Sequence, residues 1–414
     1  MSLLPWLMWG LAALFYCFGF FQRVAPGVMV QELMRDFAVG ATITGVLSAL
    51  YFYAYASLQI PIGLMLDRIG PRRMLTVSAL VAALGCYFFS LADSVGLAYA
   101  GRALVGIGTA VTWVGALKVA SVWFQPKRFA LLTGLTMAMG MAGAVGGQVP
   151  LGLAVAEFGW RGTLAGSAMI AAVMAVAFAL IVRDRPAGVE APKPGPDEGT
   201  KLWSGVALAF KEPQTYWTSL FGAMLAAPML TFAGLWGVPY LMTRYEVARP
   251  EAAGAVSLML IGWGIGSPLF GWLSDHWHQR RLPMLVSVIG SLAITLAWMY
   301  LPLSLGLLSV LLFLSGICAG GMVLLFATAR EHNPIWAAGA ALGIVNMAVM
   351  GNGAIFQSLT GWLLDLGWTG ALSNGARIYS MEAWQSAFLV LPACQIASLI
   401  GALLVRETHC RPQK

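Results

Sequence analysis

Long apolar runs alternate with short polar segments along almost the whole chain. A window of about 19 residues, the length that crosses a bilayer as a helix, finds roughly twelve of these runs. They lie near residues 6–31, 43–65, 74–92, 95–123, 129–155, 162–182, 214–243, 252–274, 283–301, 304–330, 336–364 and 383–405. We therefore predict an all-α membrane protein with twelve transmembrane helices.

Composition supports this fold class. Hydrophobic residues fill 59% of the 414 positions and charged residues only 10%, which is more apolar surface than a soluble core could hide. The first run is too long for a cleaved signal and lacks a small-residue cleavage site, so we expect it to be retained as a helix. The five cysteines show no metal-ligand spacing, and we expect neither a metal nor a cofactor.

The basic residues are divided unequally between the two faces of the predicted helical array. Sixteen Lys and Arg fall in the loops and tails of the face that holds both termini, and five on the opposite face. The positive-inside rule then places both termini in the cytoplasm, with the helices in the inner membrane. The net charge of +7 does not indicate a nucleic-acid partner, because these residues are spread over many loops.

Two polar stretches of similar sequence lie half a chain apart. GLMLDRIGPRR (63–73) aligns with GWLSDHWHQRR (271–281) at an offset of 208 residues, and the same offset carries Pro126 onto Pro334. We therefore predict two six-helix halves, residues 1–183 and 213–414, joined by a Pro-rich, charged cytoplasmic linker at 184–212. We expect the end of this linker, LWSGVALAFKEP, to form a short surface helix.

The two stretches are predicted to act as a charged latch. Their polar and small residues are Gly63, Asp67, Arg68, Gly70, Arg72 and Arg73, and then Gly271, Asp275, Arg280 and Arg281. We expect each Asp to cap or pair with the start of the next helix, each Arg to hold the loop at the lipid headgroups, and Gly63 and Gly271 to admit another helix closely. Such latches would stabilise one orientation of the halves. The alternative is that these residues only anchor the topology.

These motifs resemble those of the major facilitator superfamily. The resemblance rests on GxxxDRxGxRR after the second helix, a degenerate copy after the eighth, and RxxxGxG in the fourth (Arg102, Gly106 and Gly108), and it covers essentially the whole chain. It implies a solute path between the halves, lined by helices 1, 4, 7 and 10. The order of the motifs is most similar to the organic-anion and sugar-phosphate permease branches.

Two arginines inside predicted helices are the leading site candidates, because a charge in hydrocarbon is kept only where it faces a cavity or a partner. The planar donor fork of Arg23 suits a carboxylate or phosphate; alternatively, Arg23 extends to the headgroups. Arg102 binds the solute or has a structural role. The other candidates are polar or aromatic residues that could instead serve helix packing: Tyr16, Tyr51, Tyr55, Gln59, Trp113, Thr231, Trp236, Tyr240, Asn346 and Asn352.

Acidic residues are missing from the predicted helix interiors. All seventeen lie in loops or at helix ends. The resemblance implies an Asp on helix 1 and a Glu on helix 4 that handle a coupled proton in anion symporters, but Gln22 and Thr109 occupy those positions here. We therefore favour uniport or exchange over carboxylate-mediated proton symport.

Together these features predict a secondary transporter that moves a small organic anion, a carboxylate or phosphate ester, by alternating access. A dipeptide or zwitterion uniporter, a siderophore carrier and an efflux pump remain alternatives. A sensor is disfavoured by the short tails and linker, and an enzyme by the lack of a converging nucleophile, base and orienting group. The expected partners are the small solute and the lipid bilayer, and we expect a monomer.

Overall fold

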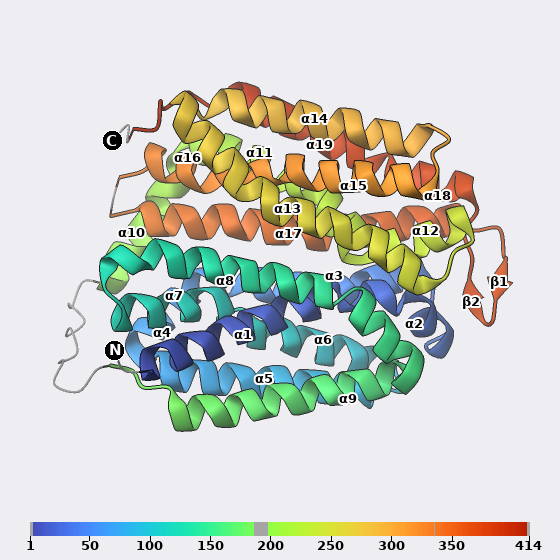
Figure 1. The fold of residues 1–414 in the computed structure, drawn as a ribbon, viewed down its shortest axis with the longest axis horizontal. Coiled ribbons are helices and arrows are strands. Elements are labelled where there is room, and N and C mark those ends of the chain that lie inside the picture. Colours follow the sequence, from blue (N-terminus) through green and yellow to red (C-terminus); the bar gives the residue numbers. More distant parts are fainter. Residues whose placement is uncertain (1–2, 186–197, 335, 412–414) are drawn as a thin grey trace. The chain divides into compact units, whose positions relative to one another are not determined.

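The computed structural model describes residues 3–185, 198–334 and 336–411 (Figure 1). Its helices up to the linker are α1 (Leu4–Val24), η1 (Ala25–Val28), α2 (Val30–Asp36), α3 (Ala41–Ser57), α4 (Gln59–Ile69), α5 (Pro71–Ser90), α6 (Val95–Thr109), α7 (Thr112–Trp123), α8 (Pro126–Gly146) and α9 (Val149–Ile181). The predicted all-α fold class is confirmed.

The second part of the chain is also helical, apart from one short hairpin. Its helices are α10 (Glu198–Lys211), α11 (Pro213–Pro228), η2 (Met229–Trp236), α12 (Gly237–Tyr245), α13 (Arg249–Trp277), α14 (Arg281–Tyr300), α15 (Leu305–Ala319), η3 (Gly320–Val323), α16 (Leu324–His332), α17 (Ala338–Leu366), α18 (Met381–Phe388) and α19 (Val390–Leu404). Strands β1 (Leu372–Ser373) and β2 (Ala376–Arg377) pair antiparallel in the hairpin that follows α17.

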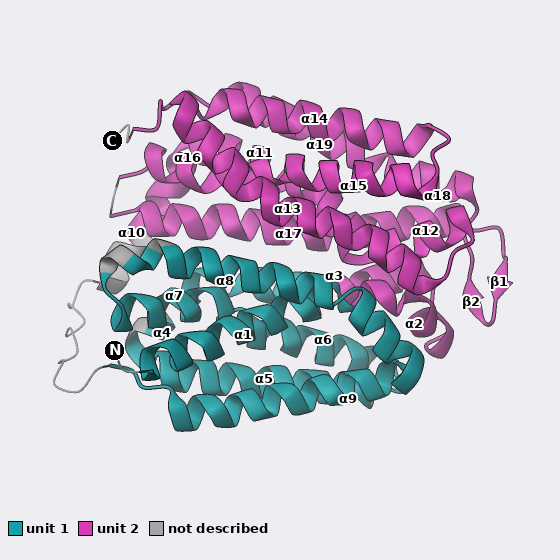
Figure 2. Cartoon of the chain, in the orientation of Figure 1, with its two compact units in different colours: residues 1–25, 50–198 teal, residues 26–49, 199–414 magenta. Residues whose placement is uncertain are grey.

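The chain forms two compact units (Figure 2). Unit 1 holds residues 1–25 and 50–198, and unit 2 holds residues 26–49 and 199–414. The boundary at 198/199 falls inside the predicted linker, whose residues 186–197 lie outside the described part of the structure. The expected helix near the end of the linker is part of α10. Residues 26–49, which the sequence pattern groups with the first half, pack in unit 2. The helix α3 therefore begins in unit 2 and ends in unit 1.

The helices are long and apolar enough for a multi-pass membrane protein. Ten described helices could each cross a bilayer, or eleven if the bent pair α2 and α3 counts as one span. The predicted twelve is not reproduced exactly because two runs are interrupted. The second is divided between α3 and α4 at Leu58, and the fifth between α8 and α9, which itself contains the non-helical Gly159 (φ 68°).

Glycines in α6 set the spacing of the unit 1 helices that carry the candidate site. A Cβ on Gly106 would collide with the backbone oxygen of Tyr51, and one on Gly108 with the backbone of Ala82 in α5. These are the two glycines of the RxxxGxG motif. Their missing side chains let α6 contact both α3 and α5 at backbone distance.

A π-helical segment, η2, follows Pro228 in unit 2. Proline lacks an N–H and its ring displaces the preceding turn, so the regular hydrogen-bond ladder is interrupted there. Wide turns of this kind are frequent at functional sites. Two predicted site residues, Thr231 and Trp236, lie on η2.

Candidate solute-binding site

Arg23, in the last turn of α1, lies among aromatic rings. Its side chain is only 5% exposed. The guanidinium carbon is 4.1 Å from the ring centroid of Phe20, 5.3 Å from Tyr55, 5.8 Å from Tyr51 and 5.9 Å from Phe52. A side chain that extended to the headgroups would be exposed, so this geometry favours an interior role for Arg23.

Arg102, on α6, holds the end of the helix that carries Arg23. Its Nη1 donates to the backbone oxygen of Gln22 at 2.7 Å, and its Nη2 to that of Arg23 at 3.3 Å. The last carbonyls of a helix lack intrahelical partners, and a cation near them is also favoured by the helix dipole. These contacts match the structural role that the sequence left open for Arg102.

Tyr51 lies beside both arginines. Its ring centroid is 4.8 Å from the guanidinium carbon of Arg102 and 5.8 Å from that of Arg23. The Tyr51 hydroxyl donates to the Gly19 backbone oxygen at 3.0 Å and lies 3.0 Å from Thr109 Oγ1. These bonds fix the orientation of the ring, so that its π face remains available to the cations.

The remaining unit 1 candidates extend the same cluster. Tyr55 stacks on Tyr51 with centroids 6.0 Å apart, and Gln59 Nε2 donates to the backbone oxygens of Tyr55 and Ala110. Tyr16 contacts Phe20 and Trp113 at centroid distances of 4.9 and 5.1 Å. The structure thus brings together all seven candidates of unit 1: Tyr16, Arg23, Tyr51, Tyr55, Gln59, Arg102 and Trp113.

The sequence reasoning did not select two residues of the aromatic cage. Phe20 is three positions before Arg23, so the helical period could have identified it. Phe52 is adjacent to Tyr51 and falls outside the four-residue stripe of Tyr51, Tyr55 and Gln59. No sequence signal separated Phe52 from an ordinary packing residue.

Buried donors outnumber acceptors around the end of α1. Arg23 Nε, Arg102 Nε and Gln22 Nε2 are buried and have no hydrogen-bond partner among the described residues. Within the same part of the chain, no Asp or Glu forms an ion pair with either arginine. Unpaired buried donors are costly, and an acceptor-rich ligand would satisfy them.

The unit 2 candidates do not form one cluster. Trp236 and Tyr240 are fully buried in an aromatic cluster with Trp298, Trp384 and Phe388. Trp236 Nε1 donates to the Gln357 backbone oxygen at 3.0 Å, and the Tyr240 hydroxyl accepts from Arg244 at 2.7 Å. These contacts join helices to one another.

The polar candidates of unit 2 lie elsewhere. Asn352 donates to the Ala223 backbone oxygen and lines a groove of about 450 Å³ between α11 and α17. The Asn352 carbonyl oxygen and the hydroxyl of Thr231 are both buried without a described partner. Asn346 is half-buried on α17. The unpartnered atoms of Asn352 and Thr231 have hydrogen-bonding capacity that a solute could use.

In unit 1, the latch stretch is tied to the end of α9. Gly70 has φ 85°, a conformation that favours glycine. The backbone N–H of Arg72 donates to Asp184 at 2.9 Å, and the Arg72 side chain donates to the Ala179 backbone oxygen at 2.6 and 2.9 Å. Arg68 and Arg73 are exposed, and the side chain of Asp67 lies outside the described part of the structure.

In unit 2, the second latch stretch is a larger buried network. Arg280 donates to Asp275 at 2.8 Å and to Glu331 at 2.7 Å, and Thr408 donates to the second oxygen of Glu331 at 2.5 Å. Burial lowers the pKa of Arg280, but its bonds to Glu331 and Asp275 outweigh burial, so this pKa lies above its ordinary value. Asp275 thus pairs with Arg280, directly before α14, and the Arg280 side chain is buried, with 8% exposure.

The acid that caps α14 comes from the C-terminal tail. Glu407 accepts the backbone N–H groups of Arg280 and Arg281, each at 2.8 Å, and the Arg281 side chain donates to the Leu403 backbone oxygen at 2.7 Å. The two units therefore share one arrangement. Asp184 and Glu407, which lie three residues beyond the ends of α9 and α19, cap the N-termini of α5 and α14. In return, Arg72 of α5 and Arg281 of α14 donate to backbone oxygens near the ends of α9 and α19. The sequence analysis missed Asp184 and Glu407.

The latch glycines do not have the predicted role within their own units. No described atom lies within 4 Å of a Cβ placed on Gly63 or Gly271. Within its own unit, neither glycine is a point of close helix approach among the described residues, and the approach expected there stays a prediction.

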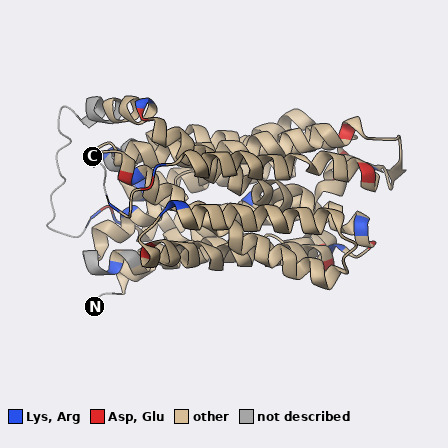
Figure 3. Cartoon of the chain, turned by 90° about the horizontal axis from the view of Figure 1, so that it is seen from above, with Lys and Arg blue, Asp and Glu red and all other residues tan. Residues whose placement is uncertain are grey.

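The charges follow the same division between helix ends and helix interiors. Figure 3 shows Lys, Arg, Asp and Glu mainly near the helix ends, with few along the middle of the helices.

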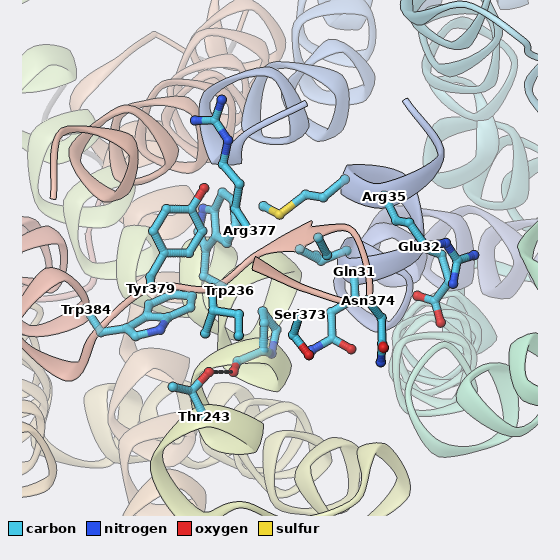
Figure 4. A pocket seen from close by; sticks show the side chains of 15 residues that line it. Gln31, Glu32, Arg35, Trp236, Thr243, Ser373, Asn374, Arg377, Tyr379 and Trp384 are labelled. Atoms are coloured by element: carbon cyan, nitrogen blue, oxygen red, sulfur yellow. Dashed lines mark hydrogen bonds between the residues drawn. The ribbon is translucent and has the colours of Figure 1, made fainter. Parts of the chain in front are cut away.

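A further cavity, of about 270 Å³, lies at the end of unit 2 that carries the hairpin (Figure 4). It is lined by α2, α12 and the hairpin, and its polar residues include Glu32, Arg35 and Arg377.

Known proteins with similar sequences include a membrane sensor and transporters. A membrane sensor protein, UhpC of Escherichia coli, is 26% identical over 426 residues, covering 94% of this chain and 89% of that protein. A probable sulfoacetate transporter of Cupriavidus necator is 23% identical over 280 residues, covering 66% of this chain and 65% of the relative. Three curated relatives are matched over only 33% to 65% of their own length.

The fold is also similar to solved structures. An inward-facing, unoccupied bacterial homolog of the human lysosomal transporter Spinster superimposes with a TM-score of 0.76 at 18% identity, covering 98% of this chain and 96% of the other. Residues 11–248 match the model of the Major Facilitator Superfamily. The chain belongs to the major facilitator superfamily.

Proposed function

We propose that this protein is a secondary transporter that moves a small organic anion across the inner membrane by alternating access. Arg23 supplies the principal positive charge for a carboxylate or phosphate ester. The protein works as a monomer with both termini in the cytoplasm. The observation that carries the proposal is the set of unpaired buried donors around Arg23, together with the absence of a described acidic partner.

The energetics favour a ligand at this position. A guanidinium in the bilayer interior costs at least about 2.5–3.5 kcal/mol, whereas a cation–π contact returns only about 0.5–2 kcal/mol. The aromatic cage therefore orients the guanidinium but does not replace a counter-ion. An anionic solute would accept a bidentate pair of hydrogen bonds and neutralise the charge.

The surrounding residues suit an organic anion. The rings of Tyr16, Tyr55 and Trp113 offer apolar faces for the carbon skeleton. In unit 2, Asn352 and Thr231 carry unsatisfied polar atoms and are proposed to contact the solute at another stage of the cycle. The names of relatives, which include sulfoacetate and hexose phosphate transporters, support an anionic cargo.

The proposed coupling mode follows from which residues could carry a proton. Gln22 and Thr109 cannot carry a proton at neutral pH, and Glu32, Asp36 and Glu331 are each paired with an arginine. We propose uniport or exchange of one anion for another. Zwitterions such as dipeptides also bear a carboxylate, and they form the second candidate cargo.

Counterflow in proteoliposomes tests this function. Vesicles loaded with a candidate solute are diluted into trace labelled solute, across a panel of hydroxy acids, sulfonates, sugar phosphates and dipeptides. We expect at least one anion to exchange without an imposed pH gradient. Binding of an anion without any exchange would instead favour a sensor, the role in the name of the relative UhpC. Concentrative uptake driven by a pH gradient alone would reject uniport.

A further inference from the structure

Asp365, in the last turn of α17, binds the first residues of α3. Its carboxylate accepts the backbone N–H of Ala41 at 3.0 Å and that of Thr42 at 2.9 Å. The Thr42 hydroxyl donates to it at 2.6 Å. These first-turn N–H groups have no intrahelical acceptor, so the carboxylate serves as an N-terminal cap supplied by another helix.

The segment after the hairpin completes the arrangement. The Tyr379 hydroxyl donates to Asp365 at 2.6 Å and accepts the Ala41 N–H at 2.9 Å, and Arg377 donates to Asp365 at 3.2 Å. Figure 4 shows Arg377 and Tyr379 among the side chains that line the neighbouring cavity. One carboxylate thus joins α3, α17 and the hairpin.

Below this carboxylate, α3 and α17 touch through their backbones. A Cβ on Gly361 would collide with the Ala41 backbone oxygen, and one on Gly45 would lie 2.7 Å from the Gln357 backbone oxygen and 3.2 Å from Ser358 Cα. At these two glycines the helices meet through backbone atoms, and neither glycine position inserts a side chain into the other helix. The two surfaces can therefore separate there without withdrawing a side chain at either glycine.

The helix α3 is well placed to transmit movement. Residues 41–49 of α3 belong to unit 2, and residues 50–57 belong to unit 1. If the two units rock, a straight helix must either bend or release the contacts of its first residues. The contacts at Asp365 are polar, and its side chain is 19% exposed, so water can replace them at little net cost.

We propose that Asp365 is a gate residue, which holds the hairpin end of unit 2 closed and releases α3 when the carrier opens at that end. The proposal rests on the proposed transport function, since a gate is needed only where a solute crosses. Asp365 is a positioning residue here and does not touch the solute. A second polar contact, between Arg249 and Glu32 of α2, lies at the same end and supports the closed arrangement.

A solute-independent experiment tests the gate. Ser358→Cys places a reporter on the α17 surface that faces Gly45, and its labelling by a membrane-impermeant maleimide is followed by peptide mass spectrometry. Asp365→Asn keeps the shape of the side chain but weakens the cap on α3. We expect this substitution to raise the labelling rate of the reporter about threefold or more, because each 1.4 kcal/mol lost from the closed state raises the open population about tenfold. Glu382→Gln, on the exposed side of α18, is the matched control and should leave labelling unchanged. Equal labelling with and without Asp365→Asn would overturn the proposal.

A reversible lock gives the functional arm. Thr42 and Asp365 have side-chain oxygens 2.6 Å apart, so Thr42→Cys with Asp365→Cys is the pair chosen for a disulfide, and loss of free thiols on oxidation verifies that the bond has formed. We expect oxidation to reduce counterflow at least about tenfold, because a conformational step then blocks turnover, and reduction to restore it. The pair Ser291→Cys with Gln395→Cys, which links α14 and α19 at another hydrogen-bonded contact, is the control and should tolerate oxidation.

The two arms separate the two proposals. Full counterflow through the oxidised Thr42–Asp365 pair would show that this contact is static, and would reject the gate. A wild-type protein that exchanges no anion would reject the proposed cargo. In that case a labelling response to Asp365→Asn would still support the gate.

Discussion

The Arg102 guanidinium donates to the backbone oxygen of Gln22 at 2.7 Å, so one buried arginine fixes the end of the helix that carries the other. This relationship assigns different tasks to two residues that look equivalent in the sequence. Arg102 satisfies protein carbonyls with two of its nitrogens. Arg23 is surrounded by ring faces, and its Nε has no hydrogen-bond partner among the described residues.

Replacing Arg102 should therefore affect both stability and solute affinity. Arg102→Gln leaves two buried carbonyl oxygens without a charged donor, which should destabilise the fold by about 1–3 kcal/mol. Arg102→Lys keeps the charge but loses the planar fork, and we expect a smaller loss of stability with a raised KM. Thermal unfolding in detergent and counterflow kinetics measure the two effects. Unchanged stability in Arg102→Gln would contradict the assigned role.

The glycines of α6 offer a matched pair. Gly106→Ala adds a methyl group against the Tyr51 backbone, which should push α3 away from α6 at a cost of about 1–3 kcal/mol and disturb the cage around Arg23. Gly96→Ala, on the same helix, meets no atom within 4 Å and should be neutral or slightly stabilising. Melting temperatures of the two variants, together with their transport rates, check this difference. Equal effects of the two substitutions would contradict it.

The tail network should weaken in acid. Burial raises the pKa of Glu407, but backbone N–H donors from Arg280, Arg281, His409 and Thr408 outweigh it, so this pKa lies below its ordinary value. The stability contributed by Glu407 is therefore fully present above its ordinary pKa, near 4.3, and is lost as the pH falls through the lower folded value. We expect Glu407→Gln to reduce the fall in melting temperature below about pH 4.3. A variant whose melting temperature falls as steeply as that of the wild type would argue against this contribution.

Periodicity predicted what lies along single helices. The spacing of Tyr51, Tyr55 and Gln59 predicted one stripe, which the structure divides between α3 and the start of α4, and the rarity of charge in the apolar runs singled out Arg23 and Arg102. Both inferences use neighbours within about two turns, where helical geometry fixes direction. The superfamily motifs added the two-half organisation.

Contacts between distant helices could not be predicted in the same way. Asp365 and Thr42 are 323 residues apart, and an isolated Asp at a helix end carries no sign of which N-terminus it caps. The same applies to Asp184 and Glu407, whose partners are set by how α9 and α19 pack. The twelve predicted spans are not matched one for one by the described helices, because hydropathy does not register breaks such as that at Leu58.

Anion binding at Arg23 can be measured directly by titration calorimetry on the purified protein, with the best anion from the counterflow panel. Arg23→Gln removes the charge while keeping hydrogen-bonding capacity, and Arg330→Gln, at an exposed helix end, is the control. We predict that Arg23→Gln weakens anion binding by about tenfold to a hundredfold, because a charge-assisted hydrogen bond contributes about 1.5–3 kcal/mol. Arg330→Gln should bind the anion as tightly as the wild type does. Equal affinity of the wild type and Arg23→Gln for the same anion would contradict the central claim.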